Sequence, residues 1–534
     1  MPTELLPAPP SPTAGPRHLT RRDDRRVVAR KSLVVPRRSG GPVVVGLVHL
    51  LCLGLIVLGA RVEFLRNSIR LDEAQSLWQT NHSYGELLRI IAEDVHVPLY
   101  HVLLRTWRLT LGPDVQTARL LSLVFLLAAV PVFYLVARKV LSRPWALFAL
   151  VVFSCSPFLQ WYGNEARMYS MLVLVTLVSQ YFFLTVATTG RTAAWVGYAA
   201  TAAVGVYVHY FFVFVLVAQG LYVLLLWRRL PRASVVRMAG VALLVGAAYL
   251  PWFLWFRANG SASETRPSLP EPSSIDYSNV YSQFLFGFQS DTVNSVLLSS
   301  WPLLVLAALA SVRVGARLDR STAYLLAAAF VPVLMAFVVS HLVTPFFLSR
   351  YMIAALPALL LLLVRFVSSL TRPVARGLAA ALLGVTVLST VVQAASPETP
   401  VDEDYRTAAQ LVEDGATPRD LVVLSSPFTV YPFEYYYDGA ARVTTLPVWD
   451  RQGPAPAFDS AQLPADVDSF AQGHQYVYLL LSYDQGYEDE VYQYFDRHLE
   501  RAASHRLSPG MQLLVYRVGY SEAPPAGELV VPAD

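Results

Sequence analysis

The chain has 534 residues, of which 54% are hydrophobic and only 15% charged, and its mean hydropathy is +0.43. This composition is too apolar for a soluble enzyme and too interrupted for a fibre. The formal net charge of +4 hides an asymmetry, because residues 397–534 hold 22 of the 38 acidic residues and only eight arginines. The composition therefore predicts a mainly α-helical polytopic membrane protein with a separate, water-facing carboxyl-terminal domain.

The amino-terminal tail, residues 1–42, carries nine Arg and Lys residues between Arg17 and Arg38. A basic flank before an apolar run is typical of the cytoplasmic side of a membrane. A signal peptide cleaved near Ala60 is the alternative, but its basic and apolar regions would both be too long. We therefore expect a disordered, basic cytoplasmic tail followed by a first membrane span.

Residues 43–396 contain repeated apolar stretches of the length that crosses a bilayer, about 20 helical residues. We expect about eleven transmembrane helices, near 43–60, 117–137, 144–161, 168–188, 193–208, 210–227, 237–256, 293–312, 322–342, 345–365 and 374–395. Basic residues recur in every second connection, beginning with Arg138, Lys139 and Arg143. Because short basic loops stay cytoplasmic, this alternation predicts a long first outer loop at 61–116 and an extracytoplasmic carboxyl terminus.

Residues 397–534 are predicted to form a small α/β domain. Strand-like runs at 421–424, 476–481 and 512–518 alternate with helical patterns at 405–413, 461–471 and 488–501. We interpret the aromatic run Tyr431–Tyr437 as core, with a sugar-stacking surface as the alternative. The Pro-rich segment 522–534 is expected to be disordered.

Two adjacent carboxylates, Asp72 and Glu73, follow the first predicted span, where no packing or solubilising role requires them. A positioned carboxylate is suited to general base catalysis. The pair is therefore the candidate catalytic centre, with Asp72 preferred and Glu73 as the alternative base. Asp72 also suits the capping of a helix that begins at Glu73, and this structural role is compatible with catalysis.

Arg167 and Arg350 lie on the predicted outer side, against the positive-inside bias. A guanidinium near the hydrocarbon needs an anionic partner, and a phosphate matches its planar fork of donors. The two arginines therefore predict a phosphate-binding site. For Glu165, two readings stay open: a salt bridge with Arg167, or a divalent-cation site shared with Asp72 or Glu73.

Five fragments together resemble the GT-C class of membrane glycosyltransferases, in the bacterial branch related to protein O-mannosyltransferases and aminoarabinose transferases. They are Leu71–Ala74, His96–Tyr100, Glu165–Tyr169, His209–Tyr210 and Ser349–Tyr351, within a resemblance that covers roughly residues 43–395. The resemblance implies a polyprenyl-phosphate-linked sugar as donor and inversion at the anomeric carbon. It also implies transfer of a pentose or hexose at the outer face of a bacterial plasma membrane, to a glycan, glycolipid or protein hydroxyl.

The resemblance also implies roles for single residues. Asp72 would be the general base, while Arg167, Tyr169, Arg350 and Tyr351 would hold the phosphate of the leaving lipid. Sugar or acceptor contacts would come from His96, Tyr100, Glu165, His209 and Tyr210, although His209 and Tyr210 also fit an ordinary interfacial belt. One departure is His96-Val97-Pro98, where relatives commonly show His-Pro-Pro. The sequence has no nucleotide-binding or zinc motif, so no cofactor is expected beyond the divalent cation left open at the carboxylates.

Two other classes of function fit a polytopic chain. A lipid or sugar transporter should place charged residues near the middle of the membrane between repeated halves. These spans are nearly free of charge and show no internal repeat, which disfavours it. A polyprenyl-linked glycan ligase or polymerase of another membrane fold would keep the outer arginines but would not require a carboxylate in the first outer loop. Neither the sugar nor the acceptor is identified by the sequence.

Overall fold

The computed structural model describes residues 41–94, 96–229, 231–259, 269–289, 319–396, 403–451 and 455–518. The chain divides into two units, Met1–Val44 and Val45–Asp534. In the shorter unit only the first residues of α1 are described, and every other described element belongs to the longer unit. The predicted tail up to residue 40, the predicted span at 293–312 and the segment 522–534 lie outside the described residues.

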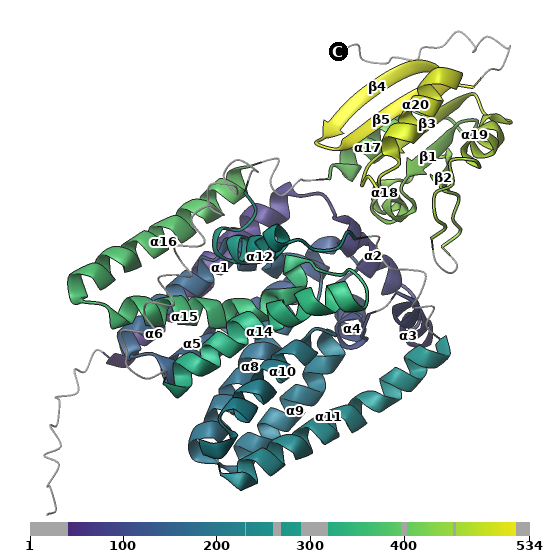
Figure 1. Cartoon of the computed structure of the whole chain (residues 1–534). Helices are drawn as coiled ribbons and strands as arrows, with labels where there is room; N and C mark the ends of the chain where they lie inside the picture. The colour runs from purple at the N-terminus through teal and green to yellow at the C-terminus, as the bar shows by residue number, and fades with distance from the viewer. Residues whose placement is uncertain are drawn as a thin grey trace, which may run out of the picture. The chain divides into compact units, whose positions relative to one another are not determined.

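Seven described helices are long and apolar enough to cross a membrane, and there are eight if a pair bent by 56° is one span. The seven spans lie in α1 (Gly41–Arg66), α5 (Val115–Val140), α8 (Tyr169–Thr189), α11 (Arg232–Asn259), α14 (Arg320–Leu342), η2 with α15 (Ser349–Ala355, Leu356–Ser369) and α16 (Arg372–Ala395). The bent pair is α6 (Arg143–Ser154) with α7 (Pro157–Gly163), and two shorter apolar helices are α9 (Thr192–Val208) and α10 (Phe212–Leu225) (Figure 1). The chain is thus a multi-pass membrane protein, while the count of eleven and the orientation of the loops stay predictions.

The core of the helical region lies where α5 packs against α8 and the bent pair. Large side chains such as Phe133 and Phe153 are fully buried there, with ring centroids 4.3 Å apart. The end of α7 approaches α5 closely, because a Cβ added at Gly163 would lie 2.3 Å from the Leu126 side chain. This close approach brings the short connection 164–168 against the start of α5.

The predicted outer loop 61–116 is itself helical. It contains α2 (Leu71–Gln79), α3 (Tyr84–Glu93) and α4 (Leu99–Leu111). The Ser83 hydroxyl caps α3 by accepting from the Glu86 N–H. Pro98 immediately precedes α4, where its missing N–H costs nothing. These helices place the acidic residues of the loop on rigid elements.

The carboxyl-terminal region forms a five-stranded sheet in the order β2-β1-β3-β5-β4 (Figure 1). Its strands are β1 (Leu421–Ser425), β2 (Arg442–Leu446), β3 (Tyr476–Leu481), β4 (Glu500–Ser508) and β5 (Met511–Arg517). β1 pairs in parallel with β2 and β3, whereas β5 is antiparallel to β3 and β4. The predicted strands at 421–424, 476–481 and 512–518 are confirmed as β1, β3 and β5, and β2 and β4 were missed.

Helices cover both faces of this sheet. α17 (Tyr405–Gly415) and α18 (Val430–Tyr436) pack on one face, and α19 (Leu463–Ala471) and α20 (Glu488–His498) pack on the other. Alternate residues of β1 serve the two faces, with Val422 on the first and Val423 on the second. The predicted helical patterns at 405–413 and 461–471 match α17 and α19, but the pattern at 488–501 ends at His498, where β4 soon follows.

The aromatic helix α18 contacts the first loop. The Tyr436 hydroxyl accepts from the Ile69 N–H at 2.9 Å, and the Tyr435 hydroxyl accepts from the Val115 N–H at 3.1 Å. The rings of Trp78 and Tyr431 lie 5.1 Å apart. The run interpreted as core is therefore partly core and partly a contact between the α/β region and α2. The remaining described helices are α12 (Ser274–Phe286), η1 (Trp227–Arg229) and η3 (Pro427–Thr429).

Candidate functional site

Glu73 is completely buried and fully bonded. Its carboxylate accepts from Nε and Nη2 of Arg119 at 2.9 and 2.6 Å, from the Ala166 N–H at 2.9 Å and from the Arg70 N–H at 3.1 Å. Burial acts to raise the pKa of Glu73, but the Arg119 guanidinium together with Arg70 and the Ala166 N–H outweighs it, and the pKa is lowered. Glu73 is thus an ionised anchor that joins α2 to α5 and to the connection before α8. It also caps α2, which begins at Leu71, so the predicted cap by Asp72 on a helix starting at Glu73 was wrong.

Asp72, the preceding residue, lies in a different environment from that of Glu73. Its Oδ2 lies 3.4 Å from Nη2 of Arg350, and its side chain remains 23% exposed. Burial acts to raise the pKa of Asp72, but Arg350 and then Arg167 outweigh it, so the pKa is lowered. The carboxylate is therefore ionised at neutral pH.

Arg167 is buried in the connection between α7 and α8. Its Nη1 donates to the Ser76 hydroxyl at 3.0 Å and to the Asp72 carbonyl at 3.3 Å, and its Nη2 lies 2.8 Å from Nε2 of His96. The same Nε2 of His96 also lies 3.7 Å from the Asp94 carboxylate, so His96 stands between Arg167 and Asp94. Glu165 is not the partner of Arg167, since its carboxylate instead accepts from Nη1 of Arg70 at 3.3 Å.

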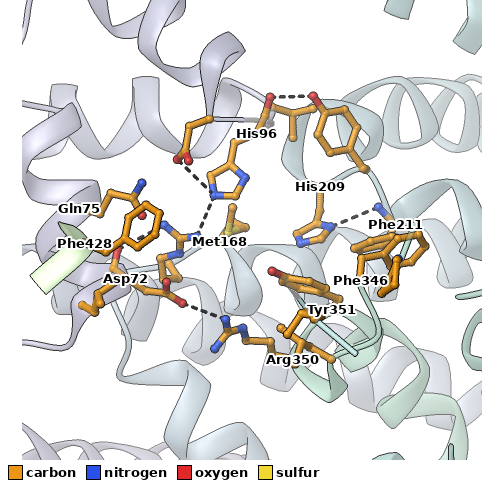
Figure 2. Close-up of a pocket in the computed structure, with 18 of the residues that line it drawn as sticks. Asp72, Gln75, His96, Met168, His209, Phe211, Phe346, Arg350, Tyr351 and Phe428 are labelled. Atoms are coloured by element: carbon orange, nitrogen blue, oxygen red, sulfur yellow. Dashed lines mark hydrogen bonds and ion pairs between the residues drawn. The ribbon is translucent and has the colours of Figure 1, made fainter. Parts of the chain in front are cut away.

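These side chains meet at one cavity of about 360 Å³ (Figure 2). Its polar lining includes Asp72, Gln75, Asp94, His96, Arg167, His209, Thr344, Arg350 and Gln485. Its apolar and aromatic lining includes Val97, Tyr210, Phe211, Pro345, Phe346, Leu348 and Tyr351. Figure 2 shows Phe211, Phe346 and Tyr351 gathered on the opposite side of the cavity from Asp72 and Gln75. The cavity therefore offers charge on one side and an apolar surface on the other.

Of the predicted residues, His209 also lines this cavity, together with Tyr210 and Tyr351. The Tyr210 hydroxyl donates to the His96 carbonyl at 2.9 Å. Burial, reinforced by His96 and Arg167, lowers the pKa of His209 to about 3. His209 is therefore neutral, and its ring can offer one donor and one acceptor.

Tyr100, Tyr169 and Glu165 lie behind the lining. Tyr100 is fully buried, with its hydroxyl 3.2 Å from that of Ser122. The Tyr169 hydroxyl is buried without a hydrogen-bond partner among the described residues. Burial raises the pKa of Glu165 to about 7, with Arg70 opposing this rise and Asp72 adding to it. Contact of these three residues with a sugar or phosphate stays a prediction.

The carboxylates considered for a cation are each engaged by an arginine. Glu73 bonds to Arg119, Glu165 to Arg70, and Asp72 lies beside Arg350. Within the described ranges, no three His, Cys, Asp or Glu side chains are grouped so that they hold a metal ion. This donor set does not fit a divalent cation.

Several lining residues were not singled out from the sequence. Gln75 lies three residues after Asp72 on α2, so helical periodicity could have found it. Phe428, Tyr483 and Gln485 come from the carboxyl-terminal α/β region. The sequence carries no signal for these three, because they reach the cavity only through the packing of that region against α2.

The comparisons with known proteins agree with this architecture. Residues 95–255 match the family described as Dolichyl-phosphate-mannose-protein mannosyltransferase. The structure of ArnT from Cupriavidus metallidurans in the apo state matches with a TM-score of 0.54 and 14% identity, over 89% of this chain and 98% of that chain. The structure of the same protein bound to undecaprenyl phosphate matches with a TM-score of 0.53 and 14% identity, over 91% and 100%. No curated protein sequence matches the chain.

The fold thus defines a multi-pass membrane protein. More particularly, the chain has an ArnT-like fold and includes a segment of the mannosyltransferase family, which confirms the resemblance predicted from the sequence.

Proposed function

We propose that the protein is an inverting glycosyltransferase that moves a pentose or hexose from a polyprenyl-phosphate donor to an acceptor hydroxyl at the outer face of the membrane. The observation that carries this proposal is the ionised Asp72 beside Arg350, in a cavity that is charged on one side and apolar on the other. A polyprenyl-phosphate sugar likewise has a charged, polar head and an apolar lipid chain. The undecaprenyl phosphate bound by ArnT, which shares this fold, supports a donor of this class.

Arg167 and Arg350 are suited to hold the phosphate. Both line the cavity, and in each of them Nε is buried without a hydrogen-bond partner among the described residues. A buried donor left unpaired costs about 1–3 kcal/mol, and phosphate oxygens would recover that cost. Two guanidinium groups would also stabilise the negative charge that grows on the phosphate as its bond to the sugar breaks.

In the proposed reaction the acceptor oxygen attacks the anomeric carbon from the face opposite the phosphate. A new carbon–oxygen bond forms while the anomeric carbon–oxygen bond to the phosphate breaks, and its electron pair stays on the phosphate oxygen. Asp72 accepts the acceptor's hydroxyl proton. The products are the glycosylated acceptor with inverted configuration and the polyprenyl phosphate.

The contact between Asp72 and Arg350 makes the basicity of Asp72 depend on whether the donor is bound. In the unliganded site, the arginine lowers the pKa of the carboxylate and so makes it a weak base. A bound phosphate competes for the same guanidinium and adds a negative charge nearby, and both effects raise the pKa of Asp72. The donor would thus strengthen the base that its own transfer requires.

The test uses the full-length protein in lipid nanodiscs with a panel of undecaprenyl-phosphate sugars as donors and with octyl glycosides and a Ser/Thr-containing hexapeptide as acceptors, and the release of undecaprenyl phosphate is the readout. We expect Asp72→Asn to bind the donor as the wild type does and to lose transfer by about 10²- to 10⁴-fold. Asp468→Asn, an exposed carboxylate on α19, is the matched control and should keep full activity. Full transfer by Asp72→Asn would remove this carboxylate from the mechanism.

A further inference from the structure

Two loops of the α/β region contribute to the cavity, and both leave the carboxyl ends of adjacent parallel strands. Phe428 follows β1, and Tyr483 and Gln485 follow β3. In open α/β sheets this edge is where ligands bind, because the loops that leave neighbouring strands converge there. The α/β region therefore presents its usual binding edge to the cavity that holds Asp72.

Phe428 stands out within its own segment. From Leu421 to Phe433 every residue is buried except Phe428, which is partly exposed and lines the cavity. Its ring is held edge-to-face by Trp449, with centroids 5.7 Å apart. An aromatic ring that is packed on one side and open on the other is a surface for a ligand rather than core.

Tyr483 is held in a strained conformation that exposes its ring. Its φ is +58°, a region that bulky side chains rarely adopt, and the residue is 43% exposed. The loop is fixed on both sides: the Ser482 hydroxyl lies 3.0 Å from that of Tyr405, and the Asp484 carboxylate accepts from the Gly486 N–H at 2.7 Å. Such strain persists where the surroundings impose it, and it concentrates at ligand-binding positions.

Tyr483 also interacts electrostatically with Asp72 and Arg350. Partial burial raises the pKa of Tyr483, and the Asp72 carboxylate adds to that rise while Arg350 opposes it. Tyr483 and Asp72 also line the same cavity. A group bound against Tyr483 would therefore share that cavity with the proposed base, as an acceptor hydroxyl must.

We propose that Phe428, Tyr483 and Gln485 form the acceptor subsite and that its occupant is a sugar ring, so that the acceptor is a glycan or glycolipid. This proposal rests on the proposed glycosyltransferase function and adds the class of acceptor to it. The C–H face of a sugar ring stacks on aromatic rings such as those of Phe428 and Tyr483. The Gln485 amide offers donors and an acceptor that suit neighbouring ring hydroxyls.

A peptide acceptor fits this lining less well. An extended peptide is usually bound by the free edge of a sheet, through its main-chain groups. The edge strands here are β2 and β4, and none of their described residues lines the cavity. What the α/β region does offer is two ring faces and a side-chain amide.

The test measures saccharide binding by saturation-transfer NMR on the full-length protein in nanodiscs. The probes are octyl glycosides of mannose, galactose and arabinose, an octyl dimannoside, and a Ser/Thr-containing hexapeptide. We expect saturation transfer to the ring protons of at least one saccharide, and about tenfold weaker binding in Phe428→Ala and Tyr483→Ala. Tyr494→Ala on α20, where the ring stacks on His498 away from the cavity lining, is the matched aromatic control and should bind as the wild type does.

Two conservative variants separate stacking from folding. Phe428→Tyr and Tyr483→Phe keep the rings and should keep saccharide affinity, whereas Tyr483→Asn suits the positive φ but should lose affinity. Binding of undecaprenyl phosphate should be unchanged in all variants. If the wild type binds saccharides but no undecaprenyl-phosphate sugar acts as donor, the proposed function fails and the subsite stands. If no saccharide binds, if the alanine variants bind like Tyr494→Ala, or if only the peptide binds at these residues, the subsite proposal is wrong.

Discussion

Removing the charge of Glu73 should mainly lower the stability of the protein, whereas removing the charge of Asp72 should mainly lower its transfer activity. Glu73→Gln leaves the Arg119 guanidinium, which is 2% exposed, without its anion. Breaking a buried ion pair from one side typically costs about 3–5 kcal/mol. Arg119 would keep its bonds to the carbonyls of Asn67 and Ser68, so we expect the lower end of that range. Asp72→Asn removes only a partly exposed contact of 3.4 Å, so we expect a loss of stability of about 1 kcal/mol or less.

Thermal unfolding of the detergent-solubilised protein is monitored by size-exclusion chromatography. Transfer is assayed on the same preparations. Glu73→Gln should unfold at a clearly lower temperature and Asp72→Asn near the wild-type temperature, while transfer is lost mainly in Asp72→Asn. The double variant Glu73→Gln with Arg119→Met removes both charges and should recover part of the stability that Glu73→Gln loses. Wild-type stability of Glu73→Gln together with loss of transfer would refute the assignment of Glu73 as the anchor.

The same contacts lead to three further predictions. Arg350→Ala should weaken undecaprenyl phosphate binding by about tenfold or more, measured by quenching of a fluorescent lipid phosphate, and Arg350→Lys should recover only part of it because the planar fork is lost. The pKa of Glu165 is raised to about 7, so its protonated form stabilises the fold at low pH and this contribution is lost as the pH rises through 7. Unfolding temperatures measured from pH 5 to 8 should therefore fall less in Glu165→Gln than in the wild type. Tyr436→Phe removes the hydroxyl that accepts from the Ile69 N–H and should cost about 1 kcal/mol of stability, with Tyr494→Phe as the unaffected control.

Much of the helical architecture could be predicted from the sequence, because a span needs a long apolar run and little else. The kink between α6 and α7 was not predicted, since the run 144–161 reads as one span. Pro157 follows a residue in extended geometry, and this starts a new helix at an angle of 56°. In the α/β region the buried strands β1 and β3 were found from their apolar runs. The edge strand β4 was missed, because its exposed, polar sequence resembles the end of the helix before it.

The candidate site was predicted in part. Asp72, His96, Arg167, His209 and Arg350 come from separate segments of the chain, and all of them line one cavity. The ion pairs within the site were harder to predict from the sequence. Sequence proximity suggested that Glu165 pairs with Arg167, whereas its partner is Arg70, which is 95 positions away. Proximity along the chain says little about ion pairs when the residues lie in an irregular connection.

The opposite surroundings of Asp72 and Glu73 follow from helix geometry. Neighbouring residues on a helix point about 100° apart, so two adjacent acids on α2 cannot face the same partner. Glu73 turns toward Arg119 on α5 and toward the Ala166 N–H in the connection before α8, and these contacts fix the rotation of α2. With that rotation fixed, Asp72 and Gln75 turn toward the cavity. The buried acid thus positions the exposed one, which explains why a site with a single proposed base needs a second carboxylate beside it.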